Sequence, residues 1–343
     1  MTWMEYKPSI VPLSSKGAAG HINYMDRVQI KENVLLAPYT VFKIGGPARW
    51  FCEVKSKEEL IGAVNWARDA GVPFFILGAG SNILASDRGF PGLVIKINLR
   101  NLRKSDFPGK SDFLVAEAGV SMARVVNFAI ENKLSGFEWG IGIPGTIGGS
   151  VFGNAGCYGS EIKDVVESVE ILDIKKSFST AYFSRHTYSH VLSKDFEIAQ
   201  LNSQDCQFGY RDSIFKKHPE WIILGATLKL APSDPQASHA KVIEYTKKRA
   251  QTQDIGEKCA GCIFKNPIPA GASELAIAAS YLIDKTGLKG RSVGKAMISP
   301  KHANYIVNNG GATADDVRAL IELVKNEVQK AHGVLLEEEV RFI

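Results

Sequence analysis

Residues 140–159 read GIGIPGTIGGSVFGNAGCYG, and this stretch determines how we interpret the rest of the chain. Eight of its twenty residues are glycine, out of 32 in the whole chain, and none is Lys, Arg, Asp or Glu. Glycine weakens helices and strands, but it permits positive φ and lets bare backbone N–H groups approach a ligand closely. A surface loop would be polar, whereas isoleucine, valine and phenylalanine are interleaved here. We therefore interpret the stretch as a cradle for a phosphate or a flat ring.

The composition is that of an ordinary globular protein. The 343 residues suffice for two or three domains, and 45% of them are hydrophobic while 22% are charged. No run approaches the roughly eighteen apolar residues of a membrane span. The N-terminal segment lacks the basic and apolar regions of a secretory signal. We therefore expect a cytoplasmic protein with no membrane association.

The cysteines and the charge exclude several classes of protein. The five cysteines are few, odd in number and scattered, which favours reduced thiols over a disulfide framework. A net charge of +5 suits an anionic small molecule but is too diffuse for nucleic acid. Cys259 and Cys262 form a C-x-x-C without a second pair of ligands, so we expect no metal site. We expect a monomer.

The spacing of apolar residues predicts an α+β chain of short strands, helices and glycine turns. Helices are expected over 57–70, with Ser56 and Glu59 as a capping box, and over 121–133, 239–249, 273–286 and 313–332. Strands are expected over 40–54, as two pieces hinged at 45–47, and over 73–77, 92–99, 113–119, 165–174, 221–231, 302–308 and 334–343. A change in composition at 231–235 predicts a domain boundary.

Two glycine turns imitate a dinucleotide-binding fingerprint, one at Gly78–Asn82 and one at residues 140–145. The first lacks an acidic residue about twenty positions further on, where it would bind a ribose. The second is followed by more glycine, and we expect no amphipathic helix there. Neither carries the Lys-Ser/Thr pair of a P-loop. We interpret them as two separate Gly-rich turns.

Seven motifs in order across residues 40–343 resemble the UDP-N-acetylenolpyruvoylglucosamine reductases, flavoenzymes that make UDP-N-acetylmuramate for peptidoglycan. They are FKIGGPA, LGAGSNIL, IPGTIGGSVFGNAGCYG, FGYRDSIFK, FKNP, HANYIVN and EVRFI. The resemblance implies an α+β fold, with an FAD-binding domain of the vanillyl-alcohol-oxidase-like (PCMH) type and a C-terminal α+β substrate domain. The chain has no room for insertions at 230–252 or 267–281, so it resembles the shorter subclass, which lacks a tyrosine-bearing loop.

The domains follow from this resemblance. We expect an N-terminal arm over 1–39, an FAD-binding domain of two subdomains over 40–230, a substrate domain over 231–333 and a C-terminal strand over 334–343. The implied reaction uses NADPH as co-substrate and a nucleotide sugar as substrate. A hydride reaches the vinyl carbon of an enolpyruvyl ether, negative charge spreads into the carboxylate, and the adjacent carbon takes a proton.

The resemblance assigns the catalytic roles to three residues. Arg211, in GYRDS, matches the cation that stabilises the enolate, a task that suits the permanently charged planar guanidinium. Glu339, in EVRFI, matches the catalytic glutamate, and we expect a raised pKa because it must be protonated or share a hydrogen. Cys262 occupies the place of a serine proton donor. It could instead be a buried structural cysteine, or could pair with Cys259 in a zinc or redox site.

The resemblance also implies the binding residues. Tyr210, Lys265, Asn266 and His302 match positions on the substrate side. Thr252 stands where the family often has a lysine, and Lys265 or Lys248 could compensate. Matches for non-covalent FAD are Gly45, Gly46, Gly78, Ala79, Gly80, Ser81, Asn82, Ile143, Pro144, Gly145, Thr146, Gly148, Gly149, Ser150, Asn154 and Ala155. Cys157 leaves covalent attachment open.

Two other functions remain open at this point. One is an FAD-dependent sugar or alcohol oxidase, which would reduce oxygen instead of consuming NADPH. It does not explain GYRDSIF, FKNP and EVRFI together. The other is a catalytically inactive flavin-binding module, supported only by the departures at Cys262 and Thr252.

Overall fold

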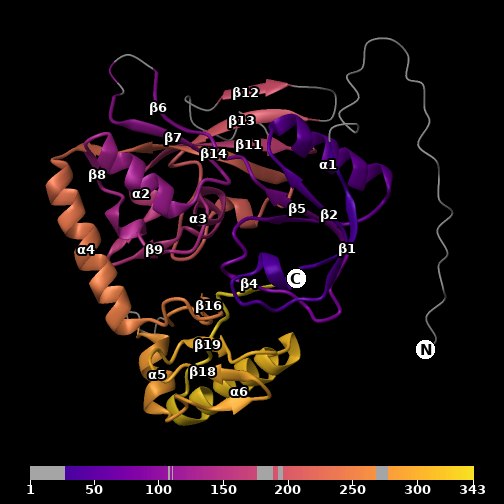
Figure 1. The fold of residues 1–343 in the computed structure, drawn as a ribbon, viewed down its shortest axis with the longest axis vertical. Coiled ribbons are helices and arrows are strands. Elements are labelled where there is room, and N and C mark those ends of the chain that lie inside the picture. Colours follow the sequence, from indigo (N-terminus) through magenta and orange to yellow (C-terminus); the bar gives the residue numbers. More distant parts are fainter. Residues whose placement is uncertain (1–27, 107–108, 110, 176–187, 192–195, 268–276) are drawn as a thin grey trace.

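The computed structural model describes residues 28–106, 109, 111–175, 188–191, 196–267 and 277–343, with the backbone alone for 188–191. Within them, a larger unit of two sheets lies above a smaller C-terminal unit in the view of Figure 1. The expected α+β architecture is confirmed. Residues 1–27 of the expected arm and 273–276 of an expected helix lie outside the described residues.

The first sheet of the larger unit has four strands. In spatial order they are β1 (Lys31–Leu35), β2 (Pro47–Val54), β5 (Phe90–Ile97) and β3 (Phe74–Leu77). β1 is antiparallel to β2, whereas β2, β5 and β3 run parallel. Helix α1 (Lys57–Asp69) connects β2 to β3. Its expected N-cap is confirmed, because Ser56 Oγ accepts a hydrogen bond from Glu59 N, although the Glu59 carboxylate accepts from Lys55 N.

Residues 31–39, which the sequence assigned to the arm, belong to this sheet. They form β1 and the 3₁₀ helix Ala37–Tyr39. Leu36 is fully buried in a core shared with Phe51, Leu77 and Val94. This apolar burial ties the segment to the sheet.

The second sheet is antiparallel and has six strands. In order they are β12 (Tyr188–Val191), β13 (Glu197–Asn202), β11 (Val166–Asp173), β14 (Trp221–Lys229), β7 (Phe113–Glu117) and β6 (Leu102–Lys104). Helices α2 (Met122–Glu131) and α3 (Ile147–Gly153) lie against its core. Two short ribbons complete the unit: β8 (Leu134–Ser135) with β15 (Ala231–Pro232), and β9 (Gly156–Cys157) with β10 (Ser160–Glu161). The remaining 3₁₀ helices are Glu138–Gly140, Ile162–Asp164 and Ile214–Lys216.

Helix α3 corrects our expectation that no helix follows Gly145. Thr146 is its N-cap, and Ile147 and Val151 on one face are fully buried. A Cβ on Gly148 would lie 2.9 Å from Cβ of Ala118, so glycine lets the helix pack closely onto the sheet. Tertiary packing therefore overrides the poor helix propensity of glycine.

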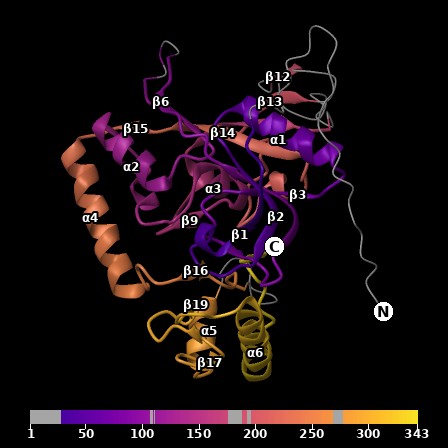
Figure 2. The ribbon, with the colours of Figure 1, turned by 45° about the vertical axis from the view of Figure 1, so that its right-hand side comes forward.

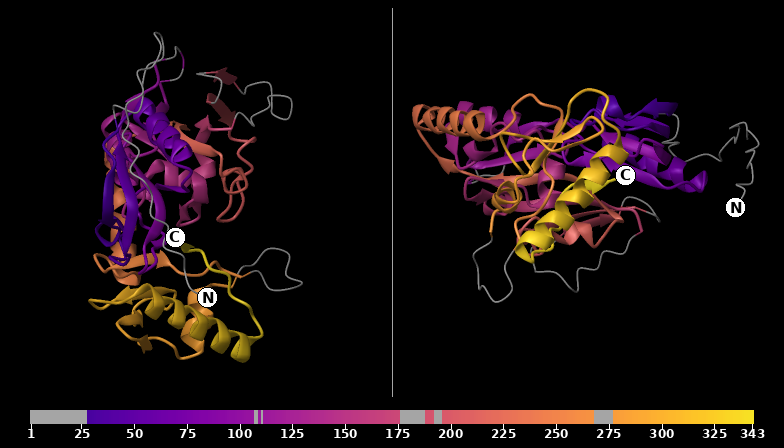
Figure 3. Two further views of the ribbon diagram at one scale, coloured as in Figure 1. Left: turned by 90° about the vertical axis from the view of Figure 1, so that its right-hand side faces the viewer. Right: turned by 90° about the horizontal axis from the view of Figure 1, so that it is seen from below.

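In its described residues, the C-terminal unit is a four-stranded antiparallel sheet with two helices. The strands, in order, are β16 (Cys259–Cys262), β19 (Tyr305–Asn308), β18 (Ala296–Ile298) and β17 (Ser292–Val293). Helices α5 (Ala279–Lys285) and α6 (Ala314–His332) pack on it, and the view from below in Figure 3 shows α6 on the face away from the larger unit. The expected capping box of Thr313 and Asp316 is confirmed. The apolar face of α6 from Val317 to Val328 is buried, also as predicted.

Two connections join the units. Helix α4 (Pro235–Thr252) is longer than the expected 239–249 because Asp234 caps it and Pro235 starts it. It runs down the side of the larger unit toward the smaller one (Figure 2), and its Val242 and Tyr245 pack against the larger core. The last residues return to the larger unit, where β20 (Arg341–Phe342) pairs in parallel with β4 (Ile83–Leu84). Residues 334–343 therefore form only a short strand, in place of the expected long one.

Candidate active site

A cavity of about 430 Å³ lies between the turn after β3 and the glycine-rich segment. Five of the predicted cofactor residues line it: Ala79, Ile143, Pro144, Gly145 and Thr146. The two turns approach each other so closely that a Cβ on Gly78 would lie 2.9 Å from Oγ1 of Thr146. The structure thus brings the two glycine turns, far apart in sequence, to one cavity.

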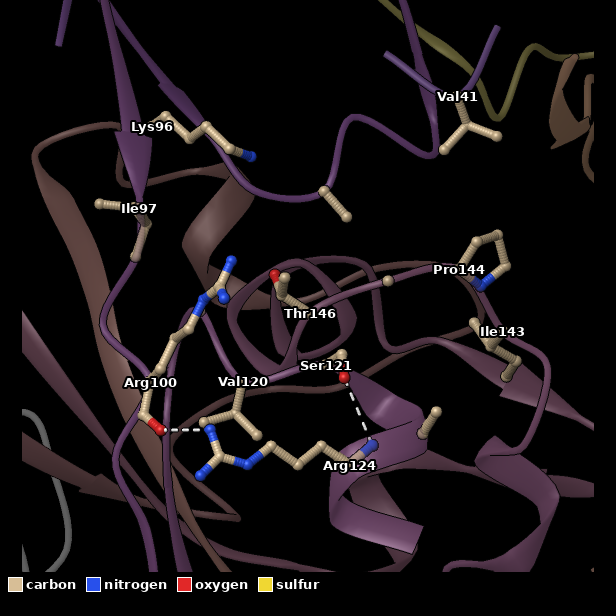
Figure 4. Close-up of a pocket in the computed structure, with 14 residues that line it drawn as sticks. Val41, Lys96, Ile97, Arg100, Val120, Ser121, Arg124, Ile143, Pro144 and Thr146 are labelled. Atoms are coloured by element: carbon tan, nitrogen blue, oxygen red, sulfur yellow. Dashed lines mark hydrogen bonds between the residues drawn. The ribbon is translucent and has the colours of Figure 1, made fainter. Parts of the chain in front are cut away.

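Three cations that the sequence reasoning missed also line this cavity: Lys96, Arg100 and Arg124. Lys96 Nζ donates a hydrogen bond to the Gly78 carbonyl at 3.0 Å, and burial lowers the pKa of Lys96. Figure 4 shows the Arg100 guanidinium pointing toward Thr146, while Arg124 Nη1 donates to the Arg100 carbonyl at 2.8 Å. The sequence did contain one signal for Lys96, because it is a lysine inside the largely apolar strand GLVIKINL.

The residues of the cavity suit a diphosphate and a flat ring, two of the groups that FAD contains. Among the described residues, no acceptor lies within hydrogen-bonding range of the backbone N–H groups of Ala79, Gly80 and Ser81. Helix α2 begins at Ser121 in the cavity wall, so the positive end of its dipole faces the same space. Val41, Ile97 and Val120 add apolar surface.

Other predicted cofactor residues contact the protein itself. A Cβ on Gly46 would lie 2.1 Å from the Asp87 carbonyl, and one on Gly45 would lie 2.7 Å from Ala85 Cβ. Asn82 Nδ2 donates a hydrogen bond to the Glu339 carbonyl at 3.0 Å. Within the glycine-rich segment the contacts are Gly149 N to Thr146 Oγ1 and Ala155 N to the Ser150 carbonyl. At Gly45 and Gly46, close main-chain packing explains why the residue is glycine.

Arg211 lies in a tight turn that leans on the end of α3. Gly209 and Asp212 exchange two backbone hydrogen bonds of 3.0 and 3.1 Å, and Arg211 between them has a left-handed φ of 53°. Asn154 is fully buried, and its Nδ2 donates to the Gly209 carbonyl at 2.7 Å. Ser213 Oγ donates to the Phe152 carbonyl at 2.7 Å. The glycine-rich segment thus supports the turn that carries the predicted catalytic arginine.

Arg211 and Glu339 form an ion pair, with 3.2 Å between Nε and Oε1. Both side chains are largely buried, at 23% and 16% exposure. Burial raises the pKa of Glu339, as we expected, although Arg211, Lys216 and Lys265 act against that rise. Burial alone would lower the pKa of Arg211, but Glu339 and Cys262 raise it overall.

Backbone pairing places Glu339 at this position. Its N–H donates to the Ile263 carbonyl at 2.7 Å, and Phe264 forms an antiparallel bridge with Glu338. Asn304 then holds Phe264 from the other side, accepting from its N–H and donating to its carbonyl. The last residues of the chain therefore lie beside the end of β16, where Cys262 is located.

Cys262 lies in the same electrostatic environment as the ion pair. Burial and the nearby Glu339 raise the pKa of its thiol to about 12, while Arg211 acts in the opposite direction. The thiol therefore stays protonated at neutral pH. Cys259 is a buried free cysteine near it, and no group of three potential metal ligands occurs among the described residues.

The predicted substrate residues divide into two groups. Tyr210 Oη accepts a hydrogen bond from Asn266 N at 3.1 Å, and Lys265 pairs with Glu337, so these three border the Arg211 turn. His302 lies apart from them. Its backbone N–H donates a hydrogen bond to Ser299 Oγ, and its ring centre lies 4.3 Å from that of Tyr305. Burial lowers the pKa of His302.

Arg249 is a further cation that the sequence reasoning missed. It is 7% exposed, and its Nη2 contacts Cys157 Sγ at 3.3 Å. Its Nε is buried without a hydrogen-bond partner among the described residues, and its guanidinium lies 5.4 Å from the Tyr158 ring centre. Lys248, the expected substitute for the lysine missing at Thr252, instead pairs with Glu244 on the exposed face of α4. Helical spacing gave no signal that Arg249 points inward.

Comparisons with known proteins agree with this geometry. A family model described as the UDP-N-acetylenolpyruvoylglucosamine reductase C-terminal domain matches residues 251–343, and an FAD-binding domain model matches 48–176. Reductases of that name from Caldanaerobacter subterraneus and Caldicellulosiruptor saccharolyticus are 38% and 39% identical, over 89% and 90% of this chain and 90% of each relative. The crystal structure of the Thermus caldophilus reductase is similar, with a TM-score of 0.68, 33% identity and coverage of 92% of this chain and 98% of that one. In the described residues, the helices are all too short or too polar to cross a membrane.

Proposed function

The chain belongs to the UDP-N-acetylenolpyruvoylglucosamine reductase family, and we propose that it reduces UDP-N-acetylglucosamine enolpyruvate to UDP-N-acetylmuramate with NADPH. Bound FAD supplies the group that accepts a hydride from the nicotinamide and gives it up again. One observation carries the proposal: Arg211, Cys262 and Glu339, from three distant segments, converge where the two units meet.

Arg211 supplies the positive charge. Hydride addition to the vinyl carbon leaves negative charge on the substrate carboxylate, and a fixed, partly desolvated guanidinium stabilises such charge most as it develops. The Nε of Arg211 faces Glu339 at 3.2 Å but makes no well-aligned hydrogen bond to it. The guanidinium therefore keeps donor capacity for the substrate.

Glu339 and Cys262 manage the protons. The raised pKa of Glu339 favours a protonated carboxyl that shares its hydrogen with the enolate. The pKa of the Cys262 thiol is raised to about 12, so the thiol keeps its proton. It can donate this proton to the strongly basic substrate carbon next to the one that receives the hydride. With so high a pKa, the thiol is still protonated at neutral pH when the substrate arrives.

The surrounding cations suit an anionic nucleotide sugar. Lys216 and Lys265 both act to lower the pKa of Glu339, and Arg249 is buried without a carboxylate partner among the described residues. An unpaired buried cation is costly, so a site that holds one is preorganised for an anion. We assign Lys265 and Arg249, together with Tyr210 and Asn266, to the carboxylate and diphosphate of the substrate.

An anaerobic two-step experiment tests the proposal. Addition of NADPH to the FAD-loaded protein should bleach the absorbance band of the oxidised flavin at about 450 nm. Stopped-flow spectroscopy records this change. Addition of UDP-N-acetylglucosamine enolpyruvate should then restore it and release one equivalent of UDP-N-acetylmuramate. Recolouring by oxygen but not by the enolpyruvyl sugar would indicate an oxidase, and flavin that NADPH never bleaches would indicate an inactive module.

Location and assembly are part of the proposal. All five cysteines are free, which agrees with a reducing cytoplasm. The three catalytic groups come from one chain, so a monomer suffices for the chemistry. Sedimentation or size-exclusion measurements at working concentrations check the monomeric state.

A further inference from the structure

The backbone at Arg211 is held in an unusual conformation. Its φ of 53° is left-handed, a region that few residues other than glycine adopt. Such a conformation persists at a functional position only when neighbouring groups constrain it. The turn from Gly209 to Asp212 contributes two backbone hydrogen bonds, but these close the turn without fixing its direction.

Two side chains form hydrogen bonds to this turn, one at each end. Asn154 Nδ2 donates to the Gly209 carbonyl at 2.7 Å, and its Oδ1 accepts from Lys163 N at 3.2 Å. Lys216 Nζ donates to the carbonyl of Arg211 itself. Asn154 is fully buried, whereas Lys216 is about one-third exposed and reaches back five residues to make its contact.

We propose that Asn154 and Lys216 are positioning residues that hold Arg211 in its left-handed conformation and aim its guanidinium at the substrate carboxylate. This inference rests on the proposed function for the role of Arg211. Asn154 acts through its tie to Gly209, and its amide is already engaged by Gly209, Glu161 and Lys163. It therefore serves the catalytic turn rather than the cofactor.

Lys216 has a second effect, through its charge. Its charge acts on Glu339 together with those of Arg211 and Lys265 and opposes the rise in the pKa of Glu339, and Glu339 in turn raises the pKa of the Cys262 thiol. Around Lys216 itself lie Asp212, with 3.8 Å between Nζ and Oδ1, and Arg341. Removing the ammonium withdraws one of three cations that stabilise ionised Glu339, so the pKa of Glu339 rises.

Substitutions at Lys216 separate the two effects. We expect Lys216→Met to lower kcat by about 10- to 100-fold, the cost of a misplaced catalytic group, while NADPH reduces the flavin at the wild-type rate. Lys216→Arg keeps a donor and a charge, and should restore most of the activity. Lys216→Gln keeps a donor alone. In Lys216→Met and Lys216→Gln, the limb of the pH–rate profile set by Glu339 should move to higher pH, and in Lys216→Arg it should not.

Amide hydrogen exchange measures how firmly the turn around Arg211 is held, and it does not require catalytic turnover. We expect the Gly209 and Asp212 amides to exchange at least several-fold faster in Lys216→Met and in Asn154→Gly, as expected when a local constraint is lost. Asn154→Gly removes the tie while retaining a residue that adopts φ of 42° without strain. Lys217→Met is the matched control, because the Lys217 side chain is exposed and makes no hydrogen bond or ion pair among the described residues.

The outcomes are distinct. If Lys216→Met and Asn154→Gly match Lys217→Met in exchange and turnover, the positioning role is wrong. If Lys216→Arg fails as badly as Lys216→Met in both readouts, the proposed grip through donor and charge is also wrong. A wild-type protein that exchanges slowly at 209 and 212 but turns over no enolpyruvyl sugar defeats the proposed function, while faster exchange in the variants would still support the grip.

Discussion

The glycine cavity and the Arg211–Cys262–Glu339 site are built by opposite means. At the cavity, the two glycine turns approach closely because Gly78 has no side chain where a Cβ would meet Thr146. The catalytic site is formed by side chains that converge from three segments, and two of these come together through the pairing of residues 263–265 with 337–340. A change at the catalytic site should therefore slow one half-reaction, whereas a change in the cavity that lowers flavin binding should weaken both.

The two half-reactions are expected to differ most in their response to a substitution at Cys262. Replacing Cys262 by alanine removes the proton donor, and the rate of flavin reoxidation by the enolpyruvyl sugar should fall by about 10²- to 10⁴-fold. Flavin reduction by NADPH should remain within about twofold of wild type, because the glycine cavity is unchanged. Stopped-flow measurement of the two half-reactions checks this.

Cys262→Ser is the matched control for that change. A hydroxyl occupies nearly the same volume and can also donate a proton, so most of the lost rate should return. Equal losses in both half-reactions for Cys262→Ala, or a serine variant as slow as the alanine variant, would contradict the assignment of Cys262 as the donor.

A substitution at Gly80 is expected to weaken both half-reactions, because it disturbs the cavity wall. Its φ is 66°, and a Cβ would lie 2.2 Å from the Tyr39 carbonyl. Gly80→Ala should therefore lower the free energy of unfolding by about 3 kcal/mol, combining left-handed strain with overpacking. The displaced segment carries Val41 of the cavity wall, so bound flavin per protein should fall and both half-reactions should weaken together.

Gly71 provides the comparison. It has nearly the same φ, 64°, but nothing lies within 4 Å of a Cβ there. Gly71→Ala should cost only about 1 kcal/mol and leave the flavin content unchanged. Denaturant unfolding with flavin absorbance measures both variants, and an equal cost for the two would show that close packing at Gly80 does not matter.

The two sites also differ in how far the sequence could predict them. Ser56, Thr313 and the buried face of α6 followed from capping and spacing rules, because those interactions are local. Residues 143–146 of the glycine segment do line a cavity, but α3 was missed because the burial of Ile147 and Val151 depends on the sheet beneath them. Spacing rules describe one element at a time and do not include that sheet.

The catalytic site shows the same limit more strongly. Only the resemblance to a family pointed to Arg211, Cys262 and Glu339 together, since no spacing rule joins residues so far apart. Lys216 and Arg249 escaped notice because a lysine or arginine in a charged stretch is usually solvated, and only the fold shows which carbonyl or thiol it reaches. Side-chain sites assembled from distant segments therefore need the structure, whereas glycine-built sites leave a local trace.

The smallest expected effect concerns the proton on Glu339. Because burial raises its pKa in the folded protein, the native state retains this proton at a pH where the unfolded chain has released it. The stability contributed by Glu339 is thus fully present below the ordinary glutamate pKa and is lost as pH rises through the raised value. The unfolding free energy of wild type minus that of Glu339→Gln should therefore decrease as pH increases from about 4 toward neutrality. Urea unfolding at a series of pH values measures this difference, and a constant or increasing difference would mean that Arg211, Lys216 and Lys265 outweigh burial and keep Glu339 ionised.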